Sequence, residues 1–278
     1  MPPTAAQRSA KPKAARSERG EPTGSLARGL AVLEAVRDAP KRVGLAKIAE
    51  ATGLDHSTTL RLLRVLEQNG YVLRVTGTKL YTPSPKALSP LPLMHPISQL
   101  RRDGYPLIRD FSGKIGETVV LAIYLDVERM AVDIAQSHGS LAPYYDTWLR
   151  GPRHATGVGK AILLSMEPKR RRSFLGAGPL EAVTPFTITD VEKLEQDLQL
   201  SEERGYVVAR DEHHVGLTAM AANIPSWRNG HVGCIAVTGH SSKFNEEHIA
   251  RIGEELRTFT KLVAYQVRVN DVADYLNG

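Results

Sequence analysis

The stretch LAKIAEATGLDHSTTLRLLRVLEQNGYV, residues 45–72, decides the fold of the N-terminal part of the chain. Apolar residues recur at helical spacing in GLAKIAEAT, and this short helix is predicted to end at Gly53, because glycine enters a left-handed turn at little steric cost. A second helix is predicted from Ser57 to Asn69, with Gly70 as its stop. The inward-facing residues of the two helices are expected to be Leu45, Ile48, Ala49, Leu60, Leu63 and Leu66. Two short helices joined by a tight glycine turn are typical of a helix-turn-helix.

The flanking segments extend this pattern to a complete small module. Upstream, a helix is predicted to begin at Ser25, as its N-cap, and to end before Pro40. Its apolar positions at helical spacing are Leu26, Leu30, Leu33 and Val36. Downstream, YVLRVTGTKLYTP contains two apolar, β-branched runs on either side of Thr76-Gly77-Thr78, which indicates a β-hairpin. Three helices followed by a hairpin predict a winged helix-turn-helix over residues 25–82.

The positive charge of the chain is concentrated in the same part. Residues 1–82 contain 14 Lys and Arg against 7 Asp and Glu, a net charge of +7. The remainder has 36 − 14 = 22 basic and 30 − 7 = 23 acidic residues, a net charge of −1. This asymmetry indicates a module that faces nucleic acid. A basic tail without a partner is the alternative, since residues 1–24, predicted to be a disordered arm, contribute +3.

The second helix of the motif is predicted to enter the major groove of double-stranded DNA with its N-terminal end toward the bases. Its expected reading edge is Asp55, His56, Ser57, Thr58, Thr59 and Arg61. Arg61 can contact guanine or a phosphate, although Arg61 and Arg64 can also be merely solvated, and Ser57 can instead cap the helix. The expected contacts to the DNA backbone outside this helix are Arg74, Thr78 and Lys79 in the hairpin and, less directly, Arg28 in the first helix.

A second domain of mixed helices and strands is predicted behind a linker. Five prolines lie in PSPKALSPLPLMHP, residues 83–96, which is too many for a helix or a central strand. The overall fold class is therefore α+β, with a C-terminal α/β domain over residues 97–278. Helices are expected at 97–115, 158–166, 190–204 and 245–265, and strands at 118–125, 130–136, 205–212, 219–224 and 232–240.

Composition excludes several classes of protein. Cys234 is the only cysteine, so neither an intrachain disulfide nor a thiolate metal cage within one chain is possible. No apolar run is long enough to span a membrane, and the N-terminus lacks the apolar region of a secretion signal. We expect a cytoplasmic protein without membrane contact, metal or cofactor.

Motifs for catalysis are weak. The segment GVGKA at 157–161 fails as a phosphate-binding loop because His154 and Ala161 stand where glycine and Ser or Thr are needed. It also fails as a dinucleotide fingerprint, since Ile162 replaces the third glycine. His213 and His214 would point to opposite faces of a strand, so they make a poor metal site. No catalytic residue is predicted; the alternative is a small-molecule-processing enzyme built on the C-terminal domain, with the N-terminal module as an adaptor.

Six segments in order resemble the IclR family of bacterial transcription regulators, from Ser25 to about Tyr265. They are SLARGLAVLEAV, the stretch at 45–72, HATGVGKAIL, RGYVVARDEHHVG, MAANI and IAVTGHSSKF. The resemblance implies a GAF-like effector-binding domain, homodimers or dimers of dimers, and ligand-responsive control, more often repression, of small-molecule catabolism or metabolism.

The resemblance also implies an effector site around the glycine-rich turn and the later strands. The matching positions are Gly157, Val158, Ala209, Leu217, Ala219, Ala236 and Thr238. Backbone amides of Gly157 and Val158 near a helix start can hold a carboxylate, so an acid or a polar carbonyl is expected, although a close-packed turn without ligand is the alternative. Ala219 and Asn223 depart from the family's usual Cys and Pro. The aromatic residues nearby, which favour an aromatic acid but also suit a core or a dimer interface, are Tyr144, Tyr145 and Trp148.

Overall fold

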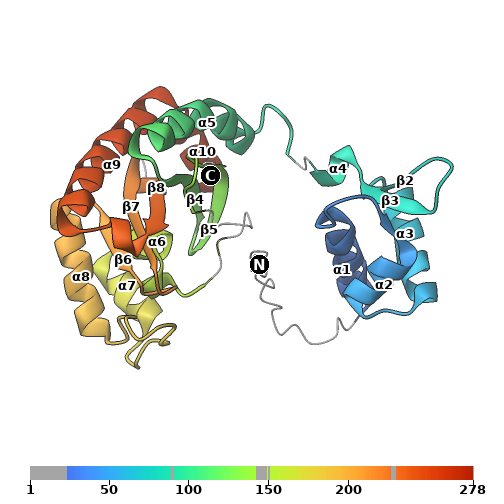
Figure 1. Ribbon diagram of the computed structural model, residues 1–278, viewed down its shortest axis with the longest axis horizontal. Coiled ribbons are helices and arrows are strands. Elements are labelled where there is room, and N and C mark those ends of the chain that lie inside the picture. The colour runs from blue at the N-terminus through green and yellow to red at the C-terminus, as the bar shows by residue number, and fades with distance from the viewer. Residues whose placement is uncertain (1–23, 89–90, 142–148, 150, 227–229, 278) are drawn as a thin grey trace, which may run out of the picture. The chain divides into compact units, whose positions relative to one another are not determined.

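The computed structural model describes residues 24–88, 91–141, 149, 151–226 and 230–277. The chain divides into two compact units, Met1–Pro90 and Leu91–Gly278 (Figure 1). The division falls inside the proline-rich segment. The expected N-terminal arm, apart from Gly24, and the aromatic residues Tyr144, Tyr145 and Trp148 lie outside the described residues.

The N-terminal unit is the expected winged helix-turn-helix. It contains the helices α1 (Ser25–Arg37), α2 (Leu45–Thr52) and α3 (His56–Gln68). The strands β1 (Val43–Gly44), β2 (Val72–Arg74) and β3 (Leu80–Pro83) form an antiparallel sheet in the order β1-β3-β2. The two residues of β1 were not expected as a strand; they pair with Tyr81 and Leu80 and so fasten the α1–α2 connection to the hairpin.

The expected N-cap of α1 is wrong. Gly24, not Ser25, precedes the helix as its N-cap, and no side chain caps it. Leu26 and Leu30 are exposed, whereas Val32 and Val36 are fully buried, because the face that packs on α2 and α3 lies to one side of the leucine stripe. In α3 the buried side chains are Thr59, Leu62 and Leu63, while Leu60 and Leu66 are only partly buried.

The proline-rich segment contains more structure than expected. A helical turn, α4 (Pro85–Leu88), follows β3 directly. It is tied to the N-terminal unit by Ser84, whose hydroxyl donates to the carbonyl of Gly70 at 2.5 Å, and by Lys86, whose ammonium lies 4.2 Å from the ring centre of Tyr71. Proline is compatible with the first turn of a helix, where no amide donor is needed, so counting prolines underestimated the helical content here.

The C-terminal unit is an antiparallel five-stranded sheet with helices on both faces, the expected GAF-like arrangement (Figure 1). The strand order is β5-β4-β8-β7-β6, with β4 (Thr118–Leu125), β5 (Glu128–Ala135), β6 (Val207–Arg210), β7 (Leu217–Ser226) and β8 (Gly230–His240). One face is covered by α5 (Pro96–Ile115), α9 (Glu246–Gln266) and α10 (Val269–Asn277). The other carries α6 (Gly157–Ser165), α7 (Pro168–Leu175) and α8 (Val191–Arg204).

Alternate residues of each strand fill the two cores. In β4, Val119, Leu121 and Ile123 pack toward α5 and α9, whereas Val120, Ala122 and Tyr124 pack toward α6. We call the second side the α6 face. Within the described residues, no helix is long and apolar enough to cross a membrane.

Candidate DNA-binding surface and effector site

The N-terminal end of α3 projects polar side chains into solvent. His56, Ser57 and Arg61 are exposed, as is Arg64 one turn further along. Asp55 caps the helix: its Oδ1 accepts the Thr58 amide at 2.8 Å, and the hydrogen bonds from Thr58 lower the pKa of the Asp55 carboxyl. The capping alternative for Ser57 is therefore wrong, and its hydroxyl stays available.

Thr59 does not belong to this exposed edge. Its side chain is fully buried, and its hydroxyl donates to the carbonyl of Asp55 at 2.8 Å. The expectation that Thr59 contacts DNA is contradicted by this burial. A β-branched residue at this position packs α3 against the core instead.

The hairpin, or wing, presents its expected residues at the surface. Arg74, Thr78 and Lys79 are all exposed, and so is Arg28 on α1. The Arg74 Nε donates to the carbonyl of Thr78 at 3.3 Å, which holds this long side chain along the hairpin. A cleft of about 580 Å³ separates Glu67 of α3 from residues 74–79, so the wing and the C-terminal end of α3 face one another.

The glycine-rich turn begins α6 and is capped from its own sequence. The Thr156 hydroxyl accepts the amide of Gly159 at 3.0 Å. The first two amides of the helix, those of Gly157 and Val158, lie outside this cap. They retain the arrangement in which helix starts bind anions.

The structure brings the implied effector positions together on the α6 face. A Cβ atom at Gly157 would lie 3.0 Å from the Ala219 Cβ, so α6 approaches β7 as closely as glycine allows. Ala209 pairs with Ala219, and Ala219 with Thr238, which makes one row across β6, β7 and β8. We call the set Gly157, Val158, Ala209, Leu217, Ala219, Ala236 and Thr238 the candidate effector site.

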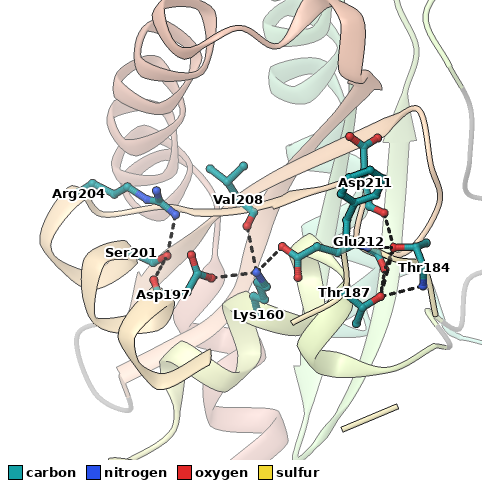
Figure 2. A network of polar contacts seen from close by, with 10 residues as sticks. Lys160, Thr184, Thr187, Asp197, Ser201, Arg204, Val208, Asp211 and Glu212 are labelled. Atoms are coloured by element: carbon teal, nitrogen blue, oxygen red, sulfur yellow. Dashed lines mark hydrogen bonds and ion pairs between the residues drawn. The ribbon is translucent and has the colours of Figure 1, made fainter. Parts of the chain in front are cut away.

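A buried ionic network borders this site (Figure 2). Lys160 of α6 is fully buried, and its Nζ donates to Glu212 Oε1 at 2.6 Å, to Asp197 Oδ2 at 2.9 Å and to the carbonyl of Val208 at 3.3 Å. Burial raises the pKa of Glu212, against the effect of Lys160, and its second carboxylate oxygen has no hydrogen-bond partner among the described residues. The network joins α6, α8 and the loop after β6.

Two threonines fix the same loop from outside. Thr184 donates its hydroxyl to the carbonyl of Asp211 at 2.7 Å, and Thr187 donates to that of Glu212 at 2.7 Å (Figure 2). Asp211 itself has a left-handed backbone, φ 59°, and its Oδ1 accepts the Gly216 amide at 2.6 Å and the Ser241 hydroxyl at 2.7 Å. The loop after β6 is therefore held by the two threonines and also by the contacts of Asp211 with Gly216 and Ser241.

Sequence reasoning missed the roles of this network. In the sequence patterns, Lys160 appears only within the phosphate-loop-like segment GVGKA, and Glu212 only as the neighbour of His213 and His214. The available signal was one charged residue within the otherwise apolar α6 sequence GVGKAILL, since a buried charge requires a partner. The identity of that partner depends on contacts 37 and 52 residues away along the chain.

The histidine pair lies in a loop, and the cysteine lies in the core. His213 and His214 lie in the loop after β6 rather than in a strand, with ring centres 4.2 Å apart. No group of three metal-binding side chains occurs in the part of the chain that is described. Burial raises the pKa of the Cys234 thiol to about 12, so it is neutral near pH 7, as expected of a packed core residue.

Asn223, the departure from the family's usual proline, joins β7 to its neighbours. It accepts the Tyr124 hydroxyl at 2.5 Å through Oδ1 and donates Nδ2 to the carbonyl of Ala161 at 3.1 Å. Proline could make neither side-chain bond. In this chain a polar clamp therefore connects β4, β7 and α6 behind the candidate effector site.

A winged helix-turn-helix followed by an α/β domain with helices on both faces of its sheet is the architecture of a DNA-binding regulator with a separate sensor domain. Two family models match the chain in that order: the IclR helix-turn-helix domain over residues 25–76 and the bacterial transcriptional regulator IclR C-terminal domain over residues 93–265. The chain belongs to the IclR family of bacterial transcriptional regulators, and it is a ligand-responsive transcription regulator.

Relatives and solved structures agree with this assignment. The transcriptional repressor IclR of Escherichia coli is 28% identical over 90% of this chain and 92% of its own length. The repressor AllR of the same organism is 28% identical over 84% of this chain and 86% of its own length. The Thermotoga maritima IclR structure is 25% identical, with a TM-score of 0.71 over 91% of this chain and 99% of that one. An IclR homolog from Microbacterium hydrocarbonoxydans, crystallised with 4-hydroxybenzoate, has the same fold at 21% identity and a TM-score of 0.69, over 87% and 99%.

Proposed function

We propose that the chain is a repressor that binds operator DNA through α3 and the wing and changes its DNA affinity when a small organic acid occupies the candidate effector site. The observation that carries the DNA half is the exposed arginine pair, Arg61 and Arg64, on the helix that follows the capped turn. The proposed DNA-contacting residues are Arg28, His56, Ser57, Thr58, Arg61, Arg64, Arg74, Thr78 and Lys79. Residues 25–82 are the DNA-binding domain, 83–96 the linker and 97–278 the effector and oligomerisation domain.

The acid is proposed because the candidate effector site offers backbone amides at the start of a helix. The helix start at Gly157 and Val158 favours an anion. The Microbacterium homolog, crystallised with 4-hydroxybenzoate, supports an aromatic acid as one option. The aligned relatives are named as repressors, which supports repression and a regulator that acts without catalysis.

Two copies of the chain are needed for the proposed mechanism. Helix-turn-helix dimers place their recognition helices on half-sites one or more helical turns apart. An effector that binds one arrangement of the dimer better shifts the equilibrium by its differential affinity, typically about 1–3 kcal/mol. A homodimer or a dimer of dimers meets this requirement.

The DNA half is tested by comparing two substitutions. Arg61→Ala is expected to weaken binding to the operator more than to unrelated duplex, because Arg61 faces the groove. Lys79→Ala is expected to weaken binding to both and to reduce the slope of log K against log salt by about 1, since one phosphate contact is lost. Fluorescence anisotropy with DNA from upstream of the gene, at several salt concentrations, measures both effects.

The matched control is Arg109→Ala, which removes one exposed arginine from α5 and should leave both affinities unchanged. If Arg61→Ala and Lys79→Ala bind like the unaltered chain, α3 and the wing are not the DNA-binding surface.

A further inference from the structure

Three lysine and arginine side chains are buried among the described residues of the C-terminal unit, and carboxylates neutralise two of them. Lys160 has Glu212 and Asp197. Arg171 holds Glu195 in a two-pronged arrangement, with Nε–Oε1 3.1 Å and Nη2–Oε2 2.7 Å. Both follow the rule that a buried charge requires a hydrogen-bonded counter-charge.

Arg129 is the exception. This second residue of β5 is 2% exposed, and Nη2 donates to the carbonyl of Gly151 at 2.7 Å. Among the described residues, no Asp or Glu lies within ion-pair distance of its guanidinium. The adjacent carboxylate, Glu128, is instead bound by Arg153 at 2.9 Å. A guanidinium has five N–H donors and remains charged near pH 7. The Arg129 guanidinium can therefore donate further hydrogen bonds and attract an anion.

The surroundings of Arg129 favour an anion. Burial, together with the nearby charge of Arg153, lowers the pKa of Arg129 to about 10, although the charge of Glu128 acts in the opposite direction. Among the described residues, the carboxylate of Glu128 therefore offsets only part of the cost of burying this cation. The uncharged Tyr124 hydroxyl and Cys234 thiol lie within its electrostatic reach. The charge of Arg129 also acts on His213: after burial and the neighbouring His214, it contributes to the lowered pKa of that imidazole.

Gly151 connects this cation to the candidate effector site. Its carbonyl holds Arg129, and a Cβ atom on Gly151 would lie 2.9 Å from Nε2 of His213. His213 stands in the loop that joins Ala209 in β6 to Leu217 in β7. Six residues after Gly151, the chain reaches Gly157. The guanidinium therefore lies against the segment that leads into the glycine-rich turn.

We propose that Arg129 is a specificity-determining residue whose guanidinium pairs with the carboxylate of the effector, so that the chain selects acids over their neutral analogues. This inference rests on the proposed function, because it assigns a ligand class to the proposed sensor domain. The carboxylate of an effector can form with Arg129 the same kind of two-pronged pair that Glu195 forms with Arg171. Neutral amides of the same shape leave the buried charge without an ion-pair partner.

The first test needs no ligand. Replacing Arg129 by Met removes a buried charge that has no ion-pair partner among the described residues, so Arg129→Met should unfold at a temperature equal to or above that of the unaltered chain. The matched control, Arg171→Met, leaves the carboxylate of Glu195 without its cation and should unfold at a clearly lower temperature. Thermal unfolding of the full chain measures both. A loss of stability in Arg129→Met as large as that in Arg171→Met would show a structural ion pair and overturn the proposal.

The second test uses named probes in the absence of DNA: acetate, succinate, benzoate and 4-hydroxybenzoate, each beside its amide. We expect at least one acid, and not its amide, to raise the unfolding temperature of the unaltered chain. Arg129→Met should weaken the binding of that acid by roughly tenfold or more in titration calorimetry, and Arg129→Lys should recover part of the loss, because it keeps the charge.

Three results would overturn the proposal: no acid stabilises the unaltered chain, acid and amide stabilise it equally, or Arg129→Met binds the acid as the unaltered chain does. Failure of the proposed function is visible separately. If the unaltered chain binds no DNA, the role as a repressor fails, while acid selectivity measured without DNA still tests Arg129.

Discussion

Lys160→Met should destabilise the C-terminal unit by about 3–5 kcal/mol, a large fraction of the stability of a typical domain. Lys160 is fully buried, and its ammonium is the shared partner of Glu212 and Asp197 (Figure 2). Methionine fills much of the same volume but leaves both carboxylates without their cation. One carboxylate oxygen of Glu212 already has no hydrogen-bond partner among the described residues, so Glu212 would then have to bind a proton or a water molecule if the unit is to stay folded. Urea unfolding followed by circular dichroism measures the loss.

Two comparisons separate this ionic contribution from packing. Lys169→Met changes an exposed lysine on α7 and should leave the urea midpoint unchanged. The double variant Lys160→Met with Glu212→Leu should regain part of the stability, since an apolar replacement of a buried ion pair is often neutral or stabilising. A single variant as stable as the unaltered chain would mean that the network does not hold α6 to α8.

Gly157→Leu should abolish the response of DNA affinity to the acid. A Cβ atom at this position would lie 3.0 Å from the Ala219 Cβ and 3.3 Å from its carbonyl carbon, so a leucine must push α6 away from β7 or occupy the space above Ala219. Either displacement spoils the amides that we propose for the acid. The expected loss is the whole coupling free energy, typically about 1–3 kcal/mol. Affinity without acid should persist, because α3 and the wing belong to the other unit.

Anisotropy titrations with and without the stabilising acid measure this coupling. Gly178→Leu is the matched control, because a Cβ atom there meets nothing within 4 Å. A variant at Gly157 that still responds to the acid would place the effector elsewhere in the C-terminal unit.

Local patterns in the sequence predicted most of the elements. The expected helix from Ser57 to Asn69 is found at His56–Gln68, and the expected strand at 118–125 is found at Thr118–Leu125. Alternating or helical apolar spacing carries this information along the chain itself. The helices α7 and α10 were missed, because PKRRRSFL is too polar to show an apolar period and α10 is short.

Long-range contacts explain what the sequence did not predict in the candidate sites. Thr59 looks like its polar neighbours until the core of the N-terminal unit determines which face of α3 is buried. Gly157, Ala219 and Thr238, which the resemblance grouped, lie on one face because the register of β7 and β8 aligns two of them and α6 brings the third. Arg129 carries no local sign of burial. Its surroundings come from Gly151, Cys234 and His213, which are scattered along the chain.

Cys234 is fully buried in the central part of β8, so the rate at which its thiol reacts with an alkylating reagent measures how often the sheet opens. It is the only thiol in the sequence, and burial suppresses its ionisation, so alkylating reagents can modify the native chain only after β8 becomes accessible. The rate of labelling at low reagent concentration then reports the free energy of that opening. A bound acid that contacts the α6 face slows the labelling by the same factor by which it stabilises the closed sheet. Ligand occupancy is thus readable from one native sulfur atom, without DNA and without an introduced probe.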